Sequence, residues 1–279
     1  MTTAQQHTIG SRLPHTESTG RTWSRDHARS ERTNDAEVIL KTVSRWDSNF
    51  VILSPVAGGD LKLETWLDPD AVDDFYNHRV LHRHHTLAQY CVNEFNTPWY
   101  QFTEQIGDLL WIETGKEIQV HVVGLFPVWV DGIIGEICWH APEWTNRPFD
   151  AGDRIELSRR LDAFDVAWRS GDLDMMAATV GDRTTSVIRV VEVDGDRRHR
   201  AIAENTNELR EAWSAPAAGR VLELERLHQI ITNWYVFAAY RLLVEVSGRT
   251  VVRETARILP VGPDGKFMGE LSYSMEIDV

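Results

Sequence analysis

The pattern of hydrophobic and polar positions is clearest in the second half of the chain. One hydrophobic set recurs at intervals of four, three and four residues, as on one face of an amphipathic helix: Leu157, Leu161, Phe164 and Trp168. Gly171 follows, where a helix commonly ends. Later the spacing changes to the alternation typical of β-strands, in the segments VLELERLHQI, NWYVFAAYRLLVEV, RTVVRETARILPV and KFMGELSYSMEI.

The chain also resembles itself. FPVWVDGIIGE at 126–136 matches LPVGPDGKFMGE at 259–270, WYQF from Trp99 matches WYVF from Trp234, and FVIL from Phe50 matches SVIR from Ser186. Glu113-Thr114 is a fourth match, to Glu254-Thr255. Four ordered matches at offsets of about 133 to 141 residues predict a tandem duplication. We place the copies at about 34–145 and 155–279.

Helix starts and turns complete the expected order of elements. Asp68-Pro69 reads as an N-cap followed by proline at the first helical position, and Asn205 precedes Glu208 as in a capping box. Ser247-Gly248 and Asp264-Gly265 are the predicted turns between strands. Each copy therefore reads as helices followed by a curved antiparallel sheet, an α+β domain.

Composition limits the classes of function. Hydrophobic residues make up 42% of the chain and charged residues 25%, as in a globular protein, whereas residues 1–33 are polar and are predicted to be a disordered tail. The formal net charge of −13 argues against nucleic acid and anionic membranes as partners. Without a signal sequence or a segment of ~20 apolar residues, a cytoplasmic protein is expected. The two cysteines, Cys91 and Cys138, fit that compartment.

The order of elements and the final hairpins, VDGIIGEICW and PDGKFMGELSY, resemble the nuclear-transport-factor-2-like superfamily. Within that superfamily, the chain most resembles the SnoaL-like polyketide cyclase branch. The resemblance implies two tandem cone-shaped domains, each with N-terminal helices packed on a curved antiparallel sheet around an apolar pocket. It also implies pairing of such domains, so the two copies could form an internal pseudo-dimer, and a homo-oligomer is left open. Relatives include cyclases, isomerases, dehydratases, epoxide hydrolases and proteins that only bind.

The acid/base pair of SnoaL-like cyclases has no match in this chain. The places that the resemblance gives to a His and an Asp hold Leu125 and the Trp139-His140 region in the first copy, and the second copy has neither residue. The paired acids around an Arg of the epoxide hydrolase relatives have no clear match either. The catalytic residues of the family are therefore not carried over to this chain.

Strand alternation supplies candidates in the second copy. It places Glu254 on the apolar side of its strand, as a general base, and groups it with possible hydrogen-bond donors on neighbouring strands: His228, Tyr240 and Tyr273. Such a set would suit enolisation or elimination. The alternative is that Glu254 pairs with an Arg of a neighbouring strand and that the tyrosines are core residues.

The first copy offers Glu113, His121 and His140 as candidates, with a satisfied core histidine and an ion-paired glutamate as the alternative. The nearby histidine run lacks the glutamate of an HExxH motif, and no metal site is expected: His78, His82, His84 and His85. No phosphate-binding loop or nucleophile motif is present, and no cofactor is expected.

Tryptophans are the remaining signal. The chain has 11, and five of them fall in the predicted sheets: Trp99, Trp111, Trp129, Trp139 and Trp234. Aromatic walls suit flat apolar ligands such as polyketides, steroids or terpenoids, although the same residues could instead fill the core or seal the interface between the two copies. Two hypotheses follow: a cofactor-independent acid/base enzyme (cyclase, isomerase, dehydratase or hydrolase) acting on a hydrophobic small molecule, or a non-catalytic binding or scaffold protein with a duplicated pocket.

Overall fold

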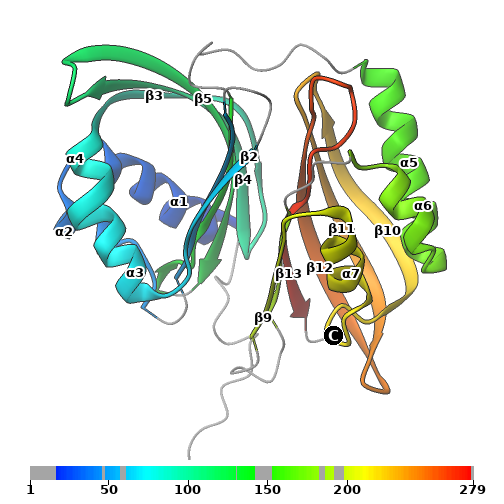
Figure 1. Cartoon of the computed structure of the whole chain (residues 1–279). Coiled ribbons are helices and arrows are strands. Elements are labelled where there is room, and N and C mark those ends of the chain that lie inside the picture. Colours follow the sequence, from blue (N-terminus) through cyan, green and yellow to red (C-terminus); the bar gives the residue numbers. More distant parts are fainter. Residues whose placement is uncertain are drawn as a thin grey trace, which may run out of the picture. The chain divides into compact units, whose positions relative to one another are not determined.

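The computed structural model describes residues 17–45, 48–56, 61–129, 131–141, 153–181, 186–191 and 198–277. The chain divides into two compact units (Figure 1), which we call the first unit, Leu13–Pro148, and the second unit, Phe149–Val279. Both combine helices with a mostly antiparallel sheet, so the α+β class is confirmed.

The first unit begins with helices and continues with strands. Its helical elements are α1 (Glu17–Glu31), α2 (Ala36–Leu40), α3 (Pro69–Asp74), a π-helical turn at Phe75–Val80, and α4 (Leu81–Arg83). Its strands are β1 (Phe50–Pro55), β2 (Leu61–Trp66), β3 (His84–Asn96), β4 (Tyr100–Trp111), β5 (Lys116–Trp129), β6 (Gly132–Ile133) and β7 (Glu136–His140). The sheet order is β2-β1-β7-β5-β4-β3, with β6 paired to β5.

The second unit repeats this order. Its helices are α5 (Arg154–Ser170), α6 (Leu173–Ala178) and α7 (Thr206–Ser214). Its strands are β8 (Ser186–Val191), β9 (Arg198–Ala203), β10 (Arg220–Ile231), β11 (Tyr235–Val246), β12 (Arg249–Pro260) and β13 (Leu271–Ile277). The sheet order is β10-β11-β12-β13-β8-β9, and α5 and α7 lie over one of its faces (Figure 1).

The two sheets have the same connectivity. In each, the last strand runs parallel to the first, so that β7 pairs with β1 and β13 with β8. The WYQF and WYVF segments are also built alike, because Thr97 and Thr232 each accept a hydrogen bond from the second backbone N–H of the motif, at 3.1 and 3.0 Å. The two units thus share both the sheet order and this local backbone geometry.

Most of the predicted helix ends are confirmed. The Asp68 carboxylate accepts a hydrogen bond from Ala71 N–H and Pro69 begins α3, while Asn205 caps α7 in the same way. Gly171 ends α5 in the left-handed conformation at φ 71°. The hydrophobic face of α5 packs on the second sheet through Leu157, Leu161 and Phe164, which are fully buried. This burial supplies most of the stability of the helix, since an isolated helix of this length is marginal.

The expected tail is corrected within the described residues, and residues 1–16 lie outside them. Residues 17–31 form α1, which contacts β3, β4 and β5. The helix was missed because its core-facing side chains are polar: Ser24, His27 and Ser30 are 4%, 1% and 5% exposed. A search for apolar periodicity cannot detect a helix that buries hydroxyls and an imidazole.

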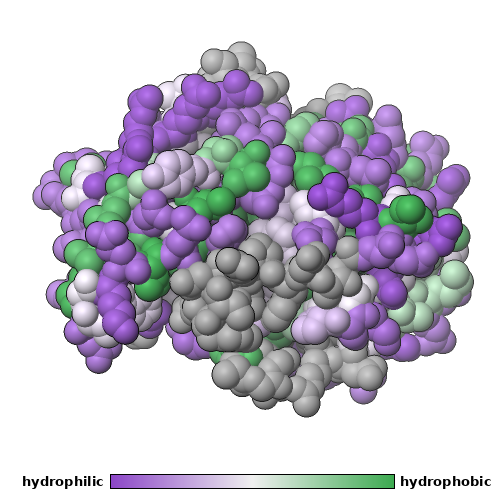
Figure 2. Space-filling model, turned by 90° about the horizontal axis from the view of Figure 1, so that it is seen from above, coloured by the Kyte–Doolittle hydropathy of each residue, from purple (hydrophilic) through white to green (hydrophobic). Residues whose placement is uncertain are grey.

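The face seen in Figure 2 is mostly hydrophilic, and its hydrophobic residues form small groups. Among the described residues, the structure contains no helix with the length and hydropathy needed to cross a membrane.

Candidate active site

A cavity of about 130 Å³ lies on one face of the first sheet. Alternation along β5 and β7 brings every second side chain to it: Val120, Val122, Gly124 and Phe126 from β5, and Glu136, Cys138 and His140 from β7. Phe75 and Tyr76 line it from the helical segment, and Glu31 lines it from α1. At about 30 Å³ for each water, a cavity of this size has room for about four water molecules or a small organic ligand.

Local backbone geometry sets the position of Glu136 in this cavity. Gly135 has φ 152°, and a Cβ at this residue would lie 2.5 Å from the Asn49 carbonyl oxygen, so only glycine fits. Directly after it, Glu136 N–H donates to that same oxygen at 3.0 Å and begins β7 opposite Phe50. The Gly-Glu pair thus interrupts the hairpin and turns a carboxyl group onto the cavity face.

His27 of α1 lies directly against this carboxyl group. Its Nδ1 is 2.6 Å from Thr42 Oγ1, whose own hydroxyl donates to Ile39 O at 2.6 Å. Thr42 therefore accepts from His27, which assigns the proton of the neutral ring to Nδ1. His27 Nε2 is left facing Glu136 Oε1 at 2.7 Å, with the Tyr76 hydroxyl at 3.3 Å.

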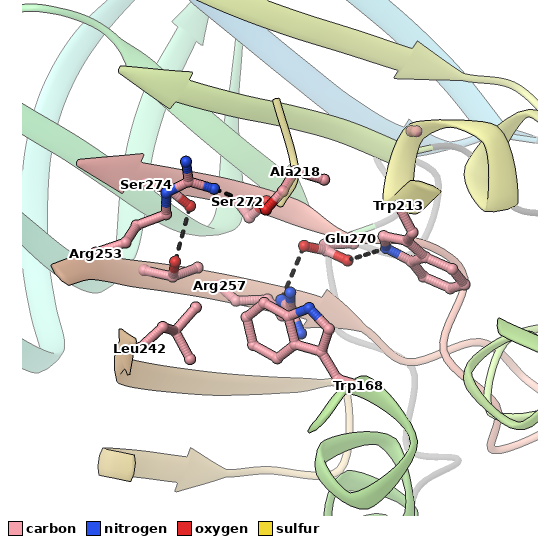
Figure 3. A pocket seen from close by; sticks show the side chains of 11 residues that line it. Trp168, Trp213, Ala218, Leu242, Arg253, Arg257, Glu270, Ser272 and Ser274 are labelled. Atoms are coloured by element: carbon pink, nitrogen blue, oxygen red, sulfur yellow. Dashed lines mark hydrogen bonds and ion pairs between the residues drawn. The ribbon is translucent and has the colours of Figure 1, made fainter. Parts of the chain in front are cut away.

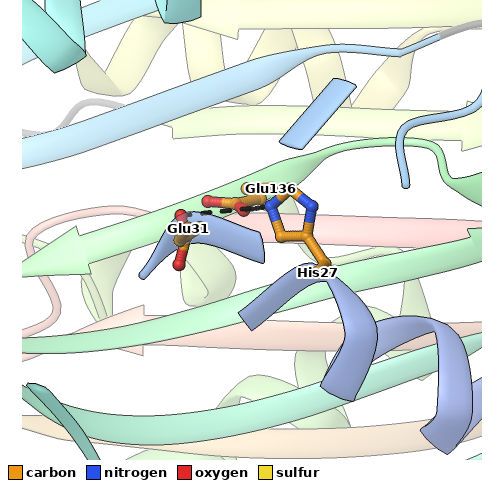
Figure 4. Close-up of side chains that lie close together, drawn as sticks. All are labelled: His27, Glu31 and Glu136. Carbon is orange, nitrogen blue, oxygen red and sulfur yellow. Dashed lines mark hydrogen bonds and ion pairs between the residues drawn. The ribbon is translucent and has the colours of Figure 1, made fainter. Parts of the chain in front are cut away.

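Glu31 lies one helical turn after His27, and its Oε1 is 4.0 Å from His27 Nε2 (Figure 4). Gln89 donates to its other oxygen at 2.6 Å. This i, i+4 spacing on α1 is what brings the imidazole and the second carboxyl group to one side of the helix. Two carboxyl groups that line one cavity, Glu31 and Glu136, thus both approach His27 Nε2.

Burial shifts the protonation of all three groups towards their neutral forms. It raises the pKa of Glu136 to about 8. Burial, together with the charge of Glu136, raises the pKa of Glu31 to about 7. Burial lowers the pKa of His27. At neutral pH Glu136 is therefore mostly protonated and donates to His27 Nε2, while Glu31 divides between acid and carboxylate.

The same three residues are the place where a cation could bind. Their ligand atoms lie within 4.8 Å of one another, and a nitrogen with two carboxylate oxygens suits several divalent metals. Binding would require both carboxyl groups to lose their protons. The expectation of no metal site had considered only the histidine run at 78–85 and not these residues.

Two further histidines border the cavity. His140, one of the predicted catalytic candidates, lies on its wall, and a second cavity of about 60 Å³ shares His84 and His140 with it. Burial lowers the pKa of each imidazole to about 4. Both are therefore neutral at pH 7 and do not act as cations there.

The other predicted residues of the first unit are corrected. Glu113 is exposed in the turn between β4 and β5, so it does not correspond to Glu254, which lies within β12. His121 alternates with Val120 and Val122, which line the cavity, so its side chain is on the opposite face. Burial lowers the pKa of His121 as well, without bringing it to the cavity.

Among the tryptophans, Trp111 lines the smaller cavity, and His84 stacks on its ring at 6.2 Å. The remaining predicted ligand contacts are buried and line neither cavity: Trp99, Trp129, Trp139 and Trp234. Trp139 alternates with Cys138 and His140 and therefore lies on the other face of the sheet. For these four, the alternative of a core role describes the structure better.

The predicted group in the second unit is divided between the two faces of its sheet. Tyr240 lies on the face covered by the helices and donates to Asp165 at 2.9 Å. Cross-strand pairing joins Glu254 to Arg241 and Met275, away from Tyr240, and Tyr273 pairs with Ala256 on that same opposite face.

His228 is also on the opposite face, because a bulge between Arg226 and His228 shifts the register by one residue. Glu254 binds Arg241 at 2.7 Å, so the alternative of an Arg partner is confirmed. The general base predicted for the second unit is therefore wrong.

The second unit places Glu270 where the first has Glu136, through the repeated Gly-Glu. Glu270 binds Arg257 at 2.8 Å and accepts from the Trp213 indole at 3.0 Å (Figure 3). The repeat of Gly-Glu in both copies was thus the sequence signal for the buried acids, although neither was chosen as a candidate. His27 and Glu31 gave no such signal because their helix was not recognised.

Comparison with known proteins gives structural similarity alone. No family model and no curated protein matches the chain. It is similar to a protein of unknown function, described as NTF-2 like, from Burkholderia xenovorans, at 18% identity and a TM-score of 0.33 over 46% of this chain and 90% of that one.

Two more solved structures are similar. The epoxide hydrolase/cyclase-like enzyme SalBIII, of pyran ring formation in the polyether salinomycin, has 13% identity and a TM-score of 0.35 over 44% of this chain and 92% of its own. A ketosteroid isomerase-like protein from Erwinia carotovora has 14% identity and a TM-score of 0.33 over 44% of this chain and 94% of its own. Each covers less than half of this chain.

Proposed function

We propose that the first unit is an acid/base enzyme that isomerises, cyclises or dehydrates a hydrophobic small molecule. The observation that carries the proposal is the pair of carboxyl groups with raised pKa, Glu31 at about 7 and Glu136 at about 8, on the wall of one cavity. A general acid and a general base work best when their pKa lies near the working pH. Titratable groups with strongly shifted pKa in a cavity are typical of active sites.

The two acids divide the roles by protonation. Glu31 as carboxylate accepts a proton from the substrate, and Glu136 as neutral acid donates one to a substrate oxygen. His27 Nε2 lies 2.7 Å from Glu136 and completes the cycle. It accepts the proton from Glu31 and passes it to Glu136, which restores both groups to their starting forms. The cycle is complete without a covalent intermediate.

Thr42 is a positioning residue in this scheme. Because its hydroxyl is committed to Ile39 O, it can only accept from His27 Nδ1, so it holds the ring with Nε2 towards Glu136. Removing the hydroxyl would allow the other tautomer and would turn an N–H donor towards a protonated acid. A residue that fixes the tautomer of a catalytic histidine affects turnover more than binding.

The lining of the cavity indicates the substrate class. Phe50, Ile52, Phe75, Val120 and Val122 surround the acids with apolar groups, and their walls suit a small hydrophobic body. His84 Nδ1 is buried and has no hydrogen-bond partner among the described residues, so a polar group of the ligand can bind there. The proposed substrate is thus mainly apolar, with one oxygen-containing group near Glu136 and another near His84.

We also infer that the chain is a tandem duplication of the nuclear-transport-factor-2-like fold, in its SnoaL-like branch. The shared sheet order and the equivalent places of Glu136 and Glu270 support the duplication. An internal pseudo-dimer of the two units and a cytoplasmic location belong to the same proposal.

The first experiment is a thermal-shift screen of the full chain with polyketide, steroid, terpenoid and epoxide compounds, followed by product analysis of each hit. A ligand at a hundredfold excess over its Kd stabilises the native state by about 2.7 kcal/mol. Turnover that is lost in Glu31→Gln and Glu136→Gln but kept in Glu254→Gln would support the enzyme. Binding without turnover would favour a binding protein, and turnover unaffected by Glu31→Gln and Glu136→Gln would contradict the proposed acids.

A further inference from the structure

The second unit has a small cavity of its own, of about 40 Å³, on the face of its sheet that the helices cover. Figure 3 shows its walls, with Trp168 and Trp213 on the helix side and Arg257 and Ser272 on the sheet. A cavity of this volume is above the minimum of roughly 10–15 Å³ for one water and suits only a very small ligand.

Several polar atoms in the walls are buried without a hydrogen-bond partner among the described residues, and they include Arg257 Nη1 and Ser272 Oγ. Both residues are nearly inaccessible, at 2% and 1% exposure. They are direct cross-strand neighbours on β12 and β13, so their side chains lie side by side on the cavity face. A buried donor without a partner is costly, and a pair of such groups in a cavity indicates a ligand that bonds to both.

Two contacts hold the guanidinium group in this position. Glu270 holds its Nε at 2.8 Å, and Arg257 Cζ lies 4.1 Å from the ring centroid of Trp168. The ion pair and the cation–π contact hold the group beside Trp168 and leave Nη1 as a donor. The site is therefore built before any ligand arrives.

The charge of the surrounding groups selects the kind of ligand. Arg257 is paired with Glu270, and Arg253 of the same cavity is paired with Glu276 at 2.9 Å. Each cation in the wall already has its anion, so a carboxylate ligand would bring an uncompensated charge into a buried space. A neutral oxygen acceptor meets no such penalty.

We propose that the second unit binds the carbonyl group of a small neutral molecule, such as an amide or a ketone, with its oxygen accepting from Arg257 Nη1 and Ser272 Oγ. The apolar part of the ligand lies against Leu242 and the two tryptophans. This site is separate from the acids of the first unit, and the inference does not rest on the proposed enzyme.

The test uses acetamide and acetate, which have nearly the same shape and differ in charge. Both are titrated into the ¹⁵N-labelled full chain while the indole N–H signals of Trp168 and Trp213 are followed by NMR. We expect saturable shifts with acetamide, with a Kd on the order of 1–10 mM for so small a ligand. Acetate should bind at least tenfold more weakly.

The matched variants are Ser272→Ala and Ser274→Ala. Both serines line the cavity from β13, but Ser274 Oγ is already bonded to Thr255 Oγ1 at 2.8 Å. Ser272→Ala should weaken acetamide binding about tenfold, as for one lost hydrogen bond, whereas Ser274→Ala should change it by less than about twofold.

Three results would overturn the proposal: acetate binding as tightly as acetamide, no saturable shift with acetamide, or equal binding by wild-type protein and Ser272→Ala. The comparison of the two ligands needs only the wild-type protein, so it decides the question even if a variant does not fold.

Discussion

Glu136 in the first unit and Glu270 in the second occupy the same place in their sheets, yet their surroundings differ. In the first unit, Gly124 of β5 pairs with Cys138 of β7. At the equivalent place in the second unit, Arg257 of β12 pairs with Ser272 of β13. A guanidinium group therefore neutralises Glu270, whereas the glycine at the equivalent place offers Glu136 no cation. Without a cation, burial raises the pKa of Glu136 to about 8.

The helices differ in the same sense. Asn34 and Gly171 follow the first helix of each unit and both have positive φ, at 54° and 71°. After the second helix, the hydroxyl groups of Thr42 and Thr179 each donate to the backbone carbonyl three residues earlier. Both pairs are separated by 137 residues (from 34 to 171 and from 42 to 179). By this alignment Phe164 and Trp168, which pack around Arg257, take the places of His27 and Glu31. The comparison teaches that one fold can hold a buried acid either as half of an ion pair or as a titratable group.

The largest expected effect is on turnover by the first unit. Glu136→Gln keeps the shape of the side chain but removes the acidic proton, so kcat on any substrate from the screen should fall by about 10²–10⁴-fold. Glu254→Gln, which breaks an ion pair with Arg241 elsewhere, is the control and should leave kcat within about twofold. Equal losses in the two variants would mean that the cavity acid is structural.

The second effect is on the stability of the second unit. Arg257→Ala leaves Glu270 buried without its cation, and the free energy of unfolding should fall by about 3–5 kcal/mol at pH 7. Arg241→Ala breaks the more exposed pair with Glu254 and should cost about 0–1 kcal/mol. Urea denaturation of both variants compares the two pairs, and a cost below about 1 kcal/mol for Arg257→Ala would show that water reaches Glu270.

The third effect concerns pH. Because the pKa of Glu31 and Glu136 is raised in the folded protein, to about 7 and about 8, their contribution to stability is present below the unfolded value of about 4.3 and is lost as the pH rises through the folded values. Glutamine does not ionise, so Glu136→Gln should have a Tm roughly 5 °C above the wild type at pH 9.

At pH 4 the wild type and Glu136→Gln should differ by less than about 2 °C, since both side chains are then neutral. Glu113→Gln, in an exposed turn, should follow the wild type across the range. Calorimetry from pH 4 to 9 measures all three proteins, and parallel curves for Glu136→Gln and the wild type would contradict a buried neutral acid.

The smallest effect tests the equivalence of the first helices. Asn34→Gly keeps the left-handed conformation but loses the bonds of the Asn34 side chain to the Thr86 backbone, at 2.8 and 3.3 Å, so it should cost about 1 kcal/mol. Gly171→Asn should change the stability by less than about 1 kcal/mol, because asparagine tolerates this conformation. A larger cost for Gly171→Asn than for Asn34→Gly would contradict the shared cap.

Parts of the fold were predictable from local patterns. The spacing of Leu157, Leu161 and Phe164 predicted α5, Asp68-Pro69 and Asn205 predicted the starts of α3 and α7, and the repeated Gly-Glu marked equivalent places in both units. These signals depend on neighbours within a few residues or on direct self-comparison. Sequence reasoning failed at α1, where the buried side chains are polar, as is expected at a functional site.

The candidate site was less predictable. Of the seven predicted catalytic residues, the structure brings His140 to the cavity of the first unit and Tyr240 to the helix-covered face of the second. Glu254 and Tyr273 lie on the opposite face of the sheet. Alternation shows which residues share a face, but it does not show which of the two faces the helices cover. The bulge that moves His228 is likewise a property of the paired strands.

By itself, the sequence determined helices with an apolar face such as α5, the capped starts of α3 and α7, and the left-handed glycine Gly171, because these depend on side-chain size and spacing along the chain. Only the tertiary structure decided which carboxyl groups are buried and what faces them. His27 and Glu136 are 109 residues apart and meet at 2.7 Å, and Arg257 neutralises one of two equivalent acids. The pKa of a carboxyl group depends on burial and on nearby charge, and both arise only when distant segments pack together.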